Sequence, residues 1–209
     1  MTRTSRPGRF AGALIVVLVS LAALPGPAAS DEWIPISREQ ARLSYDVPGL
    51  SDAVVLHVAQ KTSLGIAEIC LWKGRTGDFP RGEVYAEVLQ HNVRYIKRID
   101  LEDVTTGWTF LKDRTLQFGA RSSYWNRMGQ GKYREFSFEH HECVAFSQFW
   151  GSVAETRGVD AGTRMLFGYY CHPAGASLGQ ATIDGLLDSL RVRTTGDLVV
   201  PGPELGALQ

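Results

Sequence analysis

Apolar and polar residues alternate along several short stretches of the chain, a pattern typical of β-strands with one buried face. The N-terminal half contains three such stretches: "ARLSYDV" at 41–47, "DAVVLHVAQ" at 52–60 and "GIAEICLWK" at 65–73. The third has apolar residues on both faces, with few polar exceptions, as expected of a strand inside a sheet. We therefore predict three strands here, the last of them central.

Residues 83–99 fit two patterns. Val84, Ala86 and Val88 alternate as in a strand. A helix would instead gather one stripe, made of Tyr85, Val88, Leu89, Val93 and Ile96. The pattern leaves the choice open, with a slight preference for a strand that leads into a short helix. Asp100 and Asp103 resemble a capping signal for that helix.

Beyond Gly129 the alternation is clearer. Strands are predicted at 132–139, 142–150 and 163–171, with a long polar loop between Gly151 and Gly162. Consecutive strands with short connections usually pair antiparallel. This part of the chain is therefore predicted to form an antiparallel meander.

The last predicted element is a helix. Ser177 and Gln180 have the spacing of a capping box. An apolar stripe follows at Ile183, Leu186, Leu187 and Leu190. The fold class predicted from these elements is α+β: a mostly antiparallel β-sheet, with this C-terminal amphipathic helix and one or two further helices packed on one face.

The first thirty residues have the pattern of a secretory signal peptide. Arg3, Arg6 and Arg9 precede an apolar run over 11–24, which is too short to span a bilayer. We predict cleavage after Ser30, and no transmembrane segment in the rest of the chain. The predicted organisation is a signal peptide at 1–30, one domain at 31–195 and a loosely ordered tail at 196–209; a retained anchor is the alternative to cleavage.

Charge narrows the possible partners. Residues 31–209 hold 19 basic and 22 acidic side chains, a formal charge of −3. A protein that grips a phosphate backbone needs a basic excess, so nucleic-acid binding is not expected. The signal peptide predicts an exported protein of the periplasm or the medium, and the Ala-, Gly- and Arg-rich composition suggests a bacterial source.

Two short segments carry most of the candidate chemistry, "HHEC" at 140–143 and "CH" at 171–172. If the strands at 142–150 and 163–171 pair as a hairpin, the register that closes their loop also sets Cys143 opposite Cys171. Oxidising compartments favour disulfides. We predict a Cys143–Cys171 disulfide, and we expect Cys70 to be a buried free thiol, although its pairing stays open.

A metal site is the second interpretation of these segments. Its candidate ligands are His140, His141, Cys143, Cys171 and His172, and the disulfide would remove the two cysteines. Neighbouring strand residues point to opposite faces, and the spacing matches no familiar zinc motif. We therefore expect no metal and no cofactor, and we interpret His140 and His141 as a polar hairpin turn.

Catalytic motifs are not convincing. "GASLG" at 175–179 has the form of a nucleophile elbow. The hydrolase fold that uses this motif requires a histidine later in the chain, and none follows here. Cys143, between Glu142 and Val144, lacks the electropositive setting of a reactive thiolate. No catalytic residue is assigned.

One aromatic stretch suggests an exposed surface. Tyr124 and Trp125 adjoin Arg127 in what we interpret as a Gly-rich connection, so these three residues are the candidate binding surface. The leading hypothesis is a non-catalytic envelope protein that binds a small ligand or a protein partner. The alternatives are a hydrolase that uses carboxylates or His140/His141, and a purely structural envelope component.

Overall fold

The computed structural model describes residues 32–45, 53–62, 65–75, 77–89, 100–151 and 163–193. The predicted signal peptide, the tail at 196–209 and most of the loop between Gly151 and Gly162 lie outside these ranges. Residues 81–89 form a strand, which decides the first part of the ambiguous segment. Its remainder, 90–99, lies outside the described residues.

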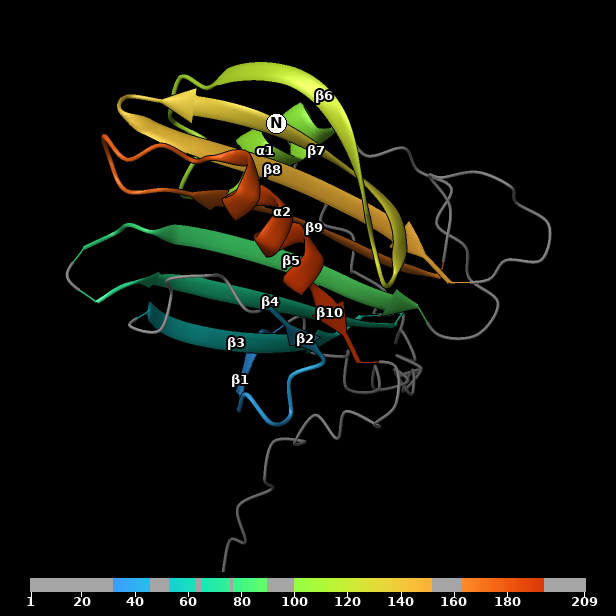
Figure 1. Cartoon of the computed structure of the whole chain (residues 1–209). Coiled ribbons are helices and arrows are strands. Elements are labelled where there is room, and N and C mark those ends of the chain that lie inside the picture. Colours follow the sequence, from blue (N-terminus) through green and yellow to red (C-terminus); the bar gives the residue numbers. More distant parts are fainter. Residues whose placement is uncertain are drawn as a thin grey trace, which may run out of the picture.

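The described chain is built on one eight-stranded sheet in which every pairing is antiparallel (Figure 1). A mostly antiparallel β-sheet is thus confirmed. In spatial order the strands are β1 (Ile34–Ile36), β3 (Ala53–Lys61), β4 (Gly65–Gly74), β5 (Arg81–Leu89), β9 (Arg164–Cys171), β8 (His141–Trp150), β7 (Gly129–Phe138) and β6 (Gln117–Asn126).

The sheet consists of two meanders joined edge to edge. β3, β4 and β5 follow one another along the chain, and so do β6, β7, β8 and β9. The two groups meet where β5 pairs with β9, for example at Val84 opposite Gly168. The sheet therefore ends at the short strand β1 on one side and at the long strand β6 on the other.

The disulfide prediction is confirmed. β8 and β9 pair with Trp150 opposite Arg164 and Cys143 opposite Cys171, the register expected from the sequence. The two cysteines are bonded, and their Cα atoms lie 4.1 Å apart. Cys70 is a buried free cysteine, as expected.

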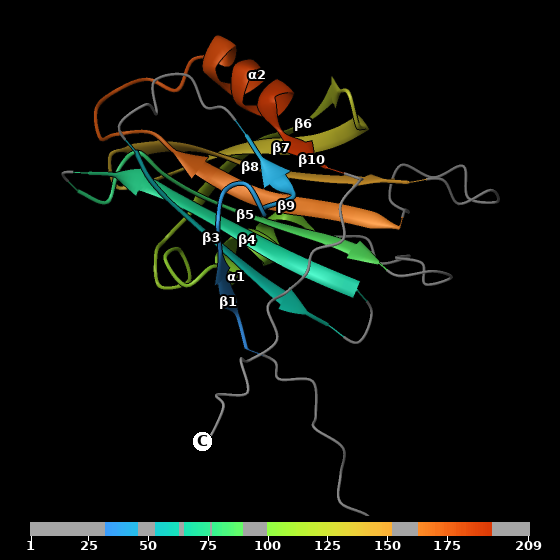
Figure 2. The same ribbon diagram turned by 90° about the horizontal axis from the view of Figure 1, so that it is seen from below.

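Two short helices lie on opposite faces of the sheet (Figure 2), so the prediction that a further helix shares one face with the C-terminal helix is wrong. α1 (Leu101–Gly107) covers the face where Cys143, Ala145 and Tyr169 are buried. α2 (Gln180–Ser189) covers the other face, next to a small antiparallel pair formed by β2 (Leu43–Ser44) and β10 (Arg191–Val192).

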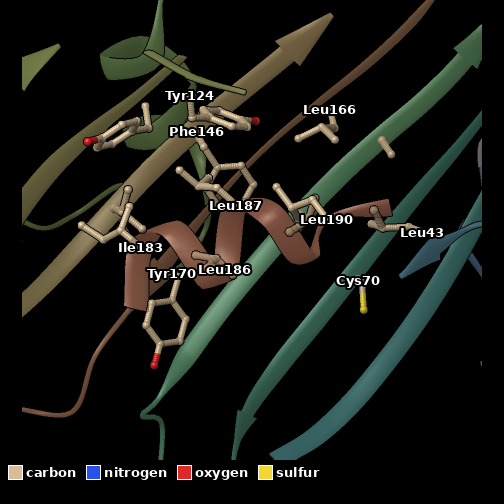
Figure 3. Close-up of a cluster of buried hydrophobic side chains, with 14 of the residues drawn as sticks. Leu43, Cys70, Tyr124, Phe146, Leu166, Tyr170, Ile183, Leu186, Leu187 and Leu190 are labelled. Atoms are coloured by element: carbon tan, nitrogen blue, oxygen red, sulfur yellow. The ribbon is translucent and has the colours of Figure 1, made fainter. Parts of the chain in front are cut away.

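The core beneath α2 explains why this helix forms. Its apolar stripe of Ile183, Leu186 and Leu187 faces the sheet, and Leu190 follows at its end; all four are almost fully buried. Figure 3 shows these side chains directed at a second layer that comes from the sheet. The labelled members of that layer include Phe146, Leu166 and Tyr170.

Helix capping follows the sequence at α1 but not at α2. The Asp100 side chain accepts a hydrogen bond from the backbone N–H of Glu102 at 2.9 Å, as the predicted cap requires. The predicted capping box of α2 is wrong. Its N-cap is Gly179, which has no side-chain cap, while Ser177 lies two residues before it and its hydroxyl donates to Glu142 at 3.4 Å.

Two further expectations need correction. Of the predicted strand at 41–47, the structure describes residues 41–45, and among these only β2 is a strand, because only two residues pair with β10. The segment interpreted as a Gly-rich connection is the ten-residue strand β6, and only Arg127 and Met128 form the turn that joins it to β7. The apolar alternation of β6 is weak, since Arg121, Ser122 and Ser123 occupy its middle.

Candidate functional site

The structure brings "HHEC" and "CH" together at one end of β8 and β9. His140 lies in the β7–β8 turn, whereas His141 begins β8 and is buried, so the interpretation of both histidines as turn residues holds only for His140. The His141 Nδ1–H donates to the carbonyl oxygen of His172 at 2.9 Å. The Nδ1 atom of His172 is hydrogen-bonded to the hydroxyl of Tyr170 at 2.9 Å.

The contacts of His141 and His172 have a structural role, because they join the ends of β8 and β9. The His141 ring is stacked on Phe79, with 3.5 Å between the ring centroids. Both cysteines of the segment are consumed by the disulfide. Within the ranges that the structure describes, no three His, Cys, Asp or Glu side chains converge as ligands for a metal ion.

Glu142 also has a structural role. Its Oε2 accepts a hydrogen bond from the backbone N–H of Leu178 at 2.7 Å and a longer one from the Ser177 hydroxyl. The carboxylate thereby fixes the segment that leads into α2. A carboxylate that holds two donors of its own chain is poorly placed to act as a general base for a substrate.

A second cluster of polar side chains lies beneath the β2–β10 pair, and the sequence does not predict it. His57 on β3 is directly opposite Cys70 on β4, with 3.6 Å between Nε2 and Sγ. The Tyr45 hydroxyl lies 3.0 Å from the same sulfur. We call these three residues the Cys70 cluster. A hairpin register between the strands at 52–60 and 65–73 was the signal that could have revealed the pairing of His57 with Cys70.

The electrostatics of the Cys70 cluster oppose catalysis. Burial raises the pKa of the Cys70 thiol to about 12. Burial also raises the pKa of Tyr45 and lowers that of His57. A nucleophilic cysteine needs a thiolate beside an imidazolium, and here both partners are neutral at neutral pH. We therefore interpret the Cys70 thiol as a buried core group that is hydrogen-bonded to its two neighbours, and not as a nucleophile.

Glu68 lies two residues from Cys70 on the same face of β4. Its Oε2 accepts from the backbone N–H groups of Arg42 and Leu43, at 2.8 and 2.9 Å. Its Oε1 is buried and has no hydrogen-bond partner among the described residues. Burial raises the pKa of this carboxyl group. The residue anchors β2 over β4 at an electrostatic cost.

The predicted surface of Tyr124, Trp125 and Arg127 divides between the two faces of β6. Trp125 is 73% exposed, and Arg127 is exposed in the adjoining turn. Tyr124 is buried on the α2 face, where its hydroxyl donates to Gln148 at 3.3 Å. The strand alternation that sends Tyr124 inward sends Trp125 to the opposite face.

The turn that carries Trp125 and Arg127 is firmly held. The Gln148 side-chain amide donates to the Asn126 side-chain oxygen at 2.9 Å and to the Gly129 carbonyl at 2.8 Å. The Asn126 side-chain amide donates in turn to Gln148 and to the carbonyl of Leu187 at the end of α2. The exposed indole is therefore presented by an ordered part of the fold.

Two surface cavities are lined by described residues. One of about 280 Å³ lies beside β6 and is lined by Asp100, Leu101, Arg121, Ser122, Ser123, Lys132 and Tyr133. The other, of about 530 Å³, is lined by Phe110, Asp113, Arg114, Thr115, Phe138 and Glu139. The guanidinium group of Arg114 lies over the rings of Phe110 and Phe138 and pairs with Glu139 at 2.8 Å. The positive charge in the larger cavity is therefore paired with a residue of the cavity wall.

Neither helix within the described ranges has the length and apolarity that a membrane crossing requires. Comparison of the chain with protein-family models, with curated proteins and with solved structures found no match. Inference about function therefore rests on the geometry given above.

Proposed function

We propose that this chain is an exported α+β protein of the periplasm or the medium, with its C-terminal helix packed on one face of the sheet, and that it binds a protein partner without catalysing a reaction. The observation that carries the proposal is Trp125. A tryptophan that is 73% exposed on an ordered strand end is unusual, because burial of an indole contributes strongly to stability. Such residues are enriched at interfaces, together with arginine.

The remaining polar groups support a non-catalytic role. The histidines at the disulfide hydrogen-bond within the chain, and the Cys70 cluster is neutral at neutral pH. The two cavities are lined largely by charged and hydroxyl side chains, unlike the mostly apolar pockets that enclose small ligands. A protein surface therefore fits Trp125 better than a small molecule does.

The test uses a photo-crosslinking amino acid in place of Trp125 in the producing organism. We expect one discrete adduct, identified by mass spectrometry. Arg75 is the matched control position, because it is exposed at the end of β4, in the other meander. Binding of the purified partner should then weaken about tenfold in Trp125→Ala, as for an interface anchor. Equal adducts at both positions, or none, would refute the proposal.

Export is tested on the same preparation by intact mass. The expected chain begins at Asp31 and is two hydrogens lighter than its reduced form, because Cys143 and Cys171 are bonded. A chain that retains residues 1–30 would contradict cleavage and favour an anchored protein.

A further inference from the structure

We infer that the partner binds as an extended peptide segment that adds a strand to the free edge of β6. The inference rests on the proposed function and specifies how the partner is held. Strand addition needs an accessible sheet edge, main-chain groups that point away from the sheet, and side-chain contacts that select a sequence. β6 meets these three conditions.

β6 is the better of the two edges. It ends the sheet and spans ten residues, whereas the opposite edge, β1, spans three. No strand in the described ranges pairs with the outer side of β6. The register shifts between Phe118 and Arg121, and the pairing with β7 is then regular from Arg121 to Asn126. Six regular residues are enough for a strand of ordinary length.

The pairing with β7 decides which backbone groups face outward. Asn126 and Gly129 close a two-residue hairpin turn and so form a hydrogen-bonded pair. Residues of an antiparallel pair alternate between hydrogen-bonded and non-hydrogen-bonded positions. Trp125, Ser123 and Arg121 therefore occupy non-hydrogen-bonded positions, and their N–H and C=O groups point away from β7.

Natural sheets often protect such edges with charged residues, proline or bulges. β6 has a bulge only at its beginning, and it contains no proline. Its one charged residue, Arg121, pairs with Asp100 at 2.9 Å, so the guanidinium is held by α1's cap residue. From Arg121 to Asn126 the edge is therefore neutral overall and regular.

The side chains beside this edge define the partner. Trp125 and Ser123 project to the α1 face, next to the 280 Å³ cavity that Asp100 and Ser123 help to line. Directly opposed side chains on neighbouring strands contact each other. The partner segment should place an apolar side chain against Trp125 and a polar one at the cavity. A peptide can follow the bend that the bulge introduces, which favours a flexible segment over a second rigid copy of this sheet edge.

The experiment uses a phage-displayed library of random peptides, each long enough to pair with β6, and the full mature chain. We expect selected peptides with alternating apolar positions. Backbone N-methylation at alternate peptide residues should weaken binding about tenfold, because each removes one hydrogen bond to β6. Methylation at the intervening residues should have little effect.

The matched protein variants are Ser123→Pro and Ser123→Ala. Proline is tolerated on an edge strand where its missing N–H faces outward, so both variants should keep the thermal stability of the wild type. We expect Ser123→Pro to lose peptide binding and Ser123→Ala to retain it. If Ser123→Pro unfolds, the N-methylation series alone decides.

The outcomes separate the two proposals. If peptide binding requires Trp125 but is unchanged by Ser123→Pro and by N-methylation, strand addition is wrong. The proposal that the protein binds a partner would still stand. Failure to select any peptide would also overturn strand addition, while the photo-crosslinking result decides the proposed function independently. A dimer in light scattering that Ser123→Pro dissociates would show that a second copy covers the edge, and would overturn the assignment of a peptide partner.

Discussion

Cys70 is a thiol whose chemistry is set by its surroundings. The side chain is fully buried, and Tyr45 and His57 are its polar neighbours. With a pKa of about 12, almost none of it is thiolate at neutral or mildly alkaline pH. The sequence predicted the buried free thiol from its apolar neighbours but not His57, because that contact depends on strand register.

The first prediction concerns this thiol. At about pH 8, where an ordinary cysteine is partly ionised, a disulfide reagent should label the native protein far more slowly than the unfolded protein. One thiol per chain should react after unfolding without reduction, and none in Cys70→Ser. Rapid labelling of the native chain would show that Cys70 is accessible and ionised.

The second prediction concerns Glu68. Because its folded-state pKa is raised above the ordinary value of 4.5, the folded chain keeps this proton to higher pH than the unfolded chain does. Its contribution to stability is therefore greatest at low pH and is lost as pH rises through the folded pKa. Glu68→Gln should retain the two backbone hydrogen bonds and should gain stability relative to the wild type as pH rises.

Urea unfolding of both proteins at about pH 5 and about pH 7 measures this difference, since other groups that titrate contribute equally to the two chains. Glu87→Gln is an informative control, because Glu87 is a buried carboxylate of the other face that accepts from Tyr85 and Thr62. A stability difference for Glu68→Gln that does not change with pH would contradict the prediction.

Of two neighbouring residues, one can be buried and the other exposed, and the sequence alone does not reveal which. The sequence predicts that Tyr124 and Trp125 share one surface, because both are aromatic and lie near glycines. The sequence does not predict β6 as a strand, because the polar residues Arg121, Ser122 and Ser123 interrupt the apolar alternation in its middle. Once the strand is known, alternation requires one ring to be buried and the other exposed.

At the scale of elements, α2 shows why a cap can be mispredicted while its helix is found. The apolar stripe from Ile183 to Leu190 was readable because its period is local. The start depends on a distant residue, because Glu142 takes the Leu178 N–H that would otherwise need a partner. A capping box in the sequence cannot report a hydrogen bond from another strand.

The third prediction concerns the β8–β9 hairpin. Its disulfide closes a sequence separation of 28 residues, for which the chain-entropy model gives a stabilisation of about 3.5 kcal/mol. The double variant Cys143→Ala/Cys171→Ala should lose roughly that amount in urea unfolding. Wild-type protein under a strong reductant is the control and should lose a similar amount. A loss far below this value would mean that the unfolded chain is already constrained.

At the scale of the molecule, the sequence predicted the sheet class and the C-terminal meander but not the strand order. Strand patterns and short connections are local, so β7, β8 and β9 could be placed in succession. The pairing of β5 with β9 is not local, and no alternation pattern identifies it. The free edge at β6 follows from that order and was likewise beyond the sequence.

The fourth prediction concerns the stability of this sheet from its centre to its edges. β9 is hydrogen-bonded on both sides and carries the disulfide, so its amides should exchange with solvent most slowly. Trp125 and Ser123, whose N–H groups point outward from β6, should exchange among the fastest in the sheet. Residue-resolved hydrogen exchange tests both. Exchange in β9 as fast as in β1 would contradict the assigned strand order.

The junction between the meanders also bears on biosynthesis. A chain is made from its N-terminus, so β3, β4 and β5 exist before β9 has been synthesised. During that interval β5 is itself an unprotected edge, and pairing across such a long sequence separation is slow. The folding chain therefore passes through a period in which β5, at the future centre of the sheet, can pair with strands of other chains. This period ends only when β9 has emerged and pairs with β5.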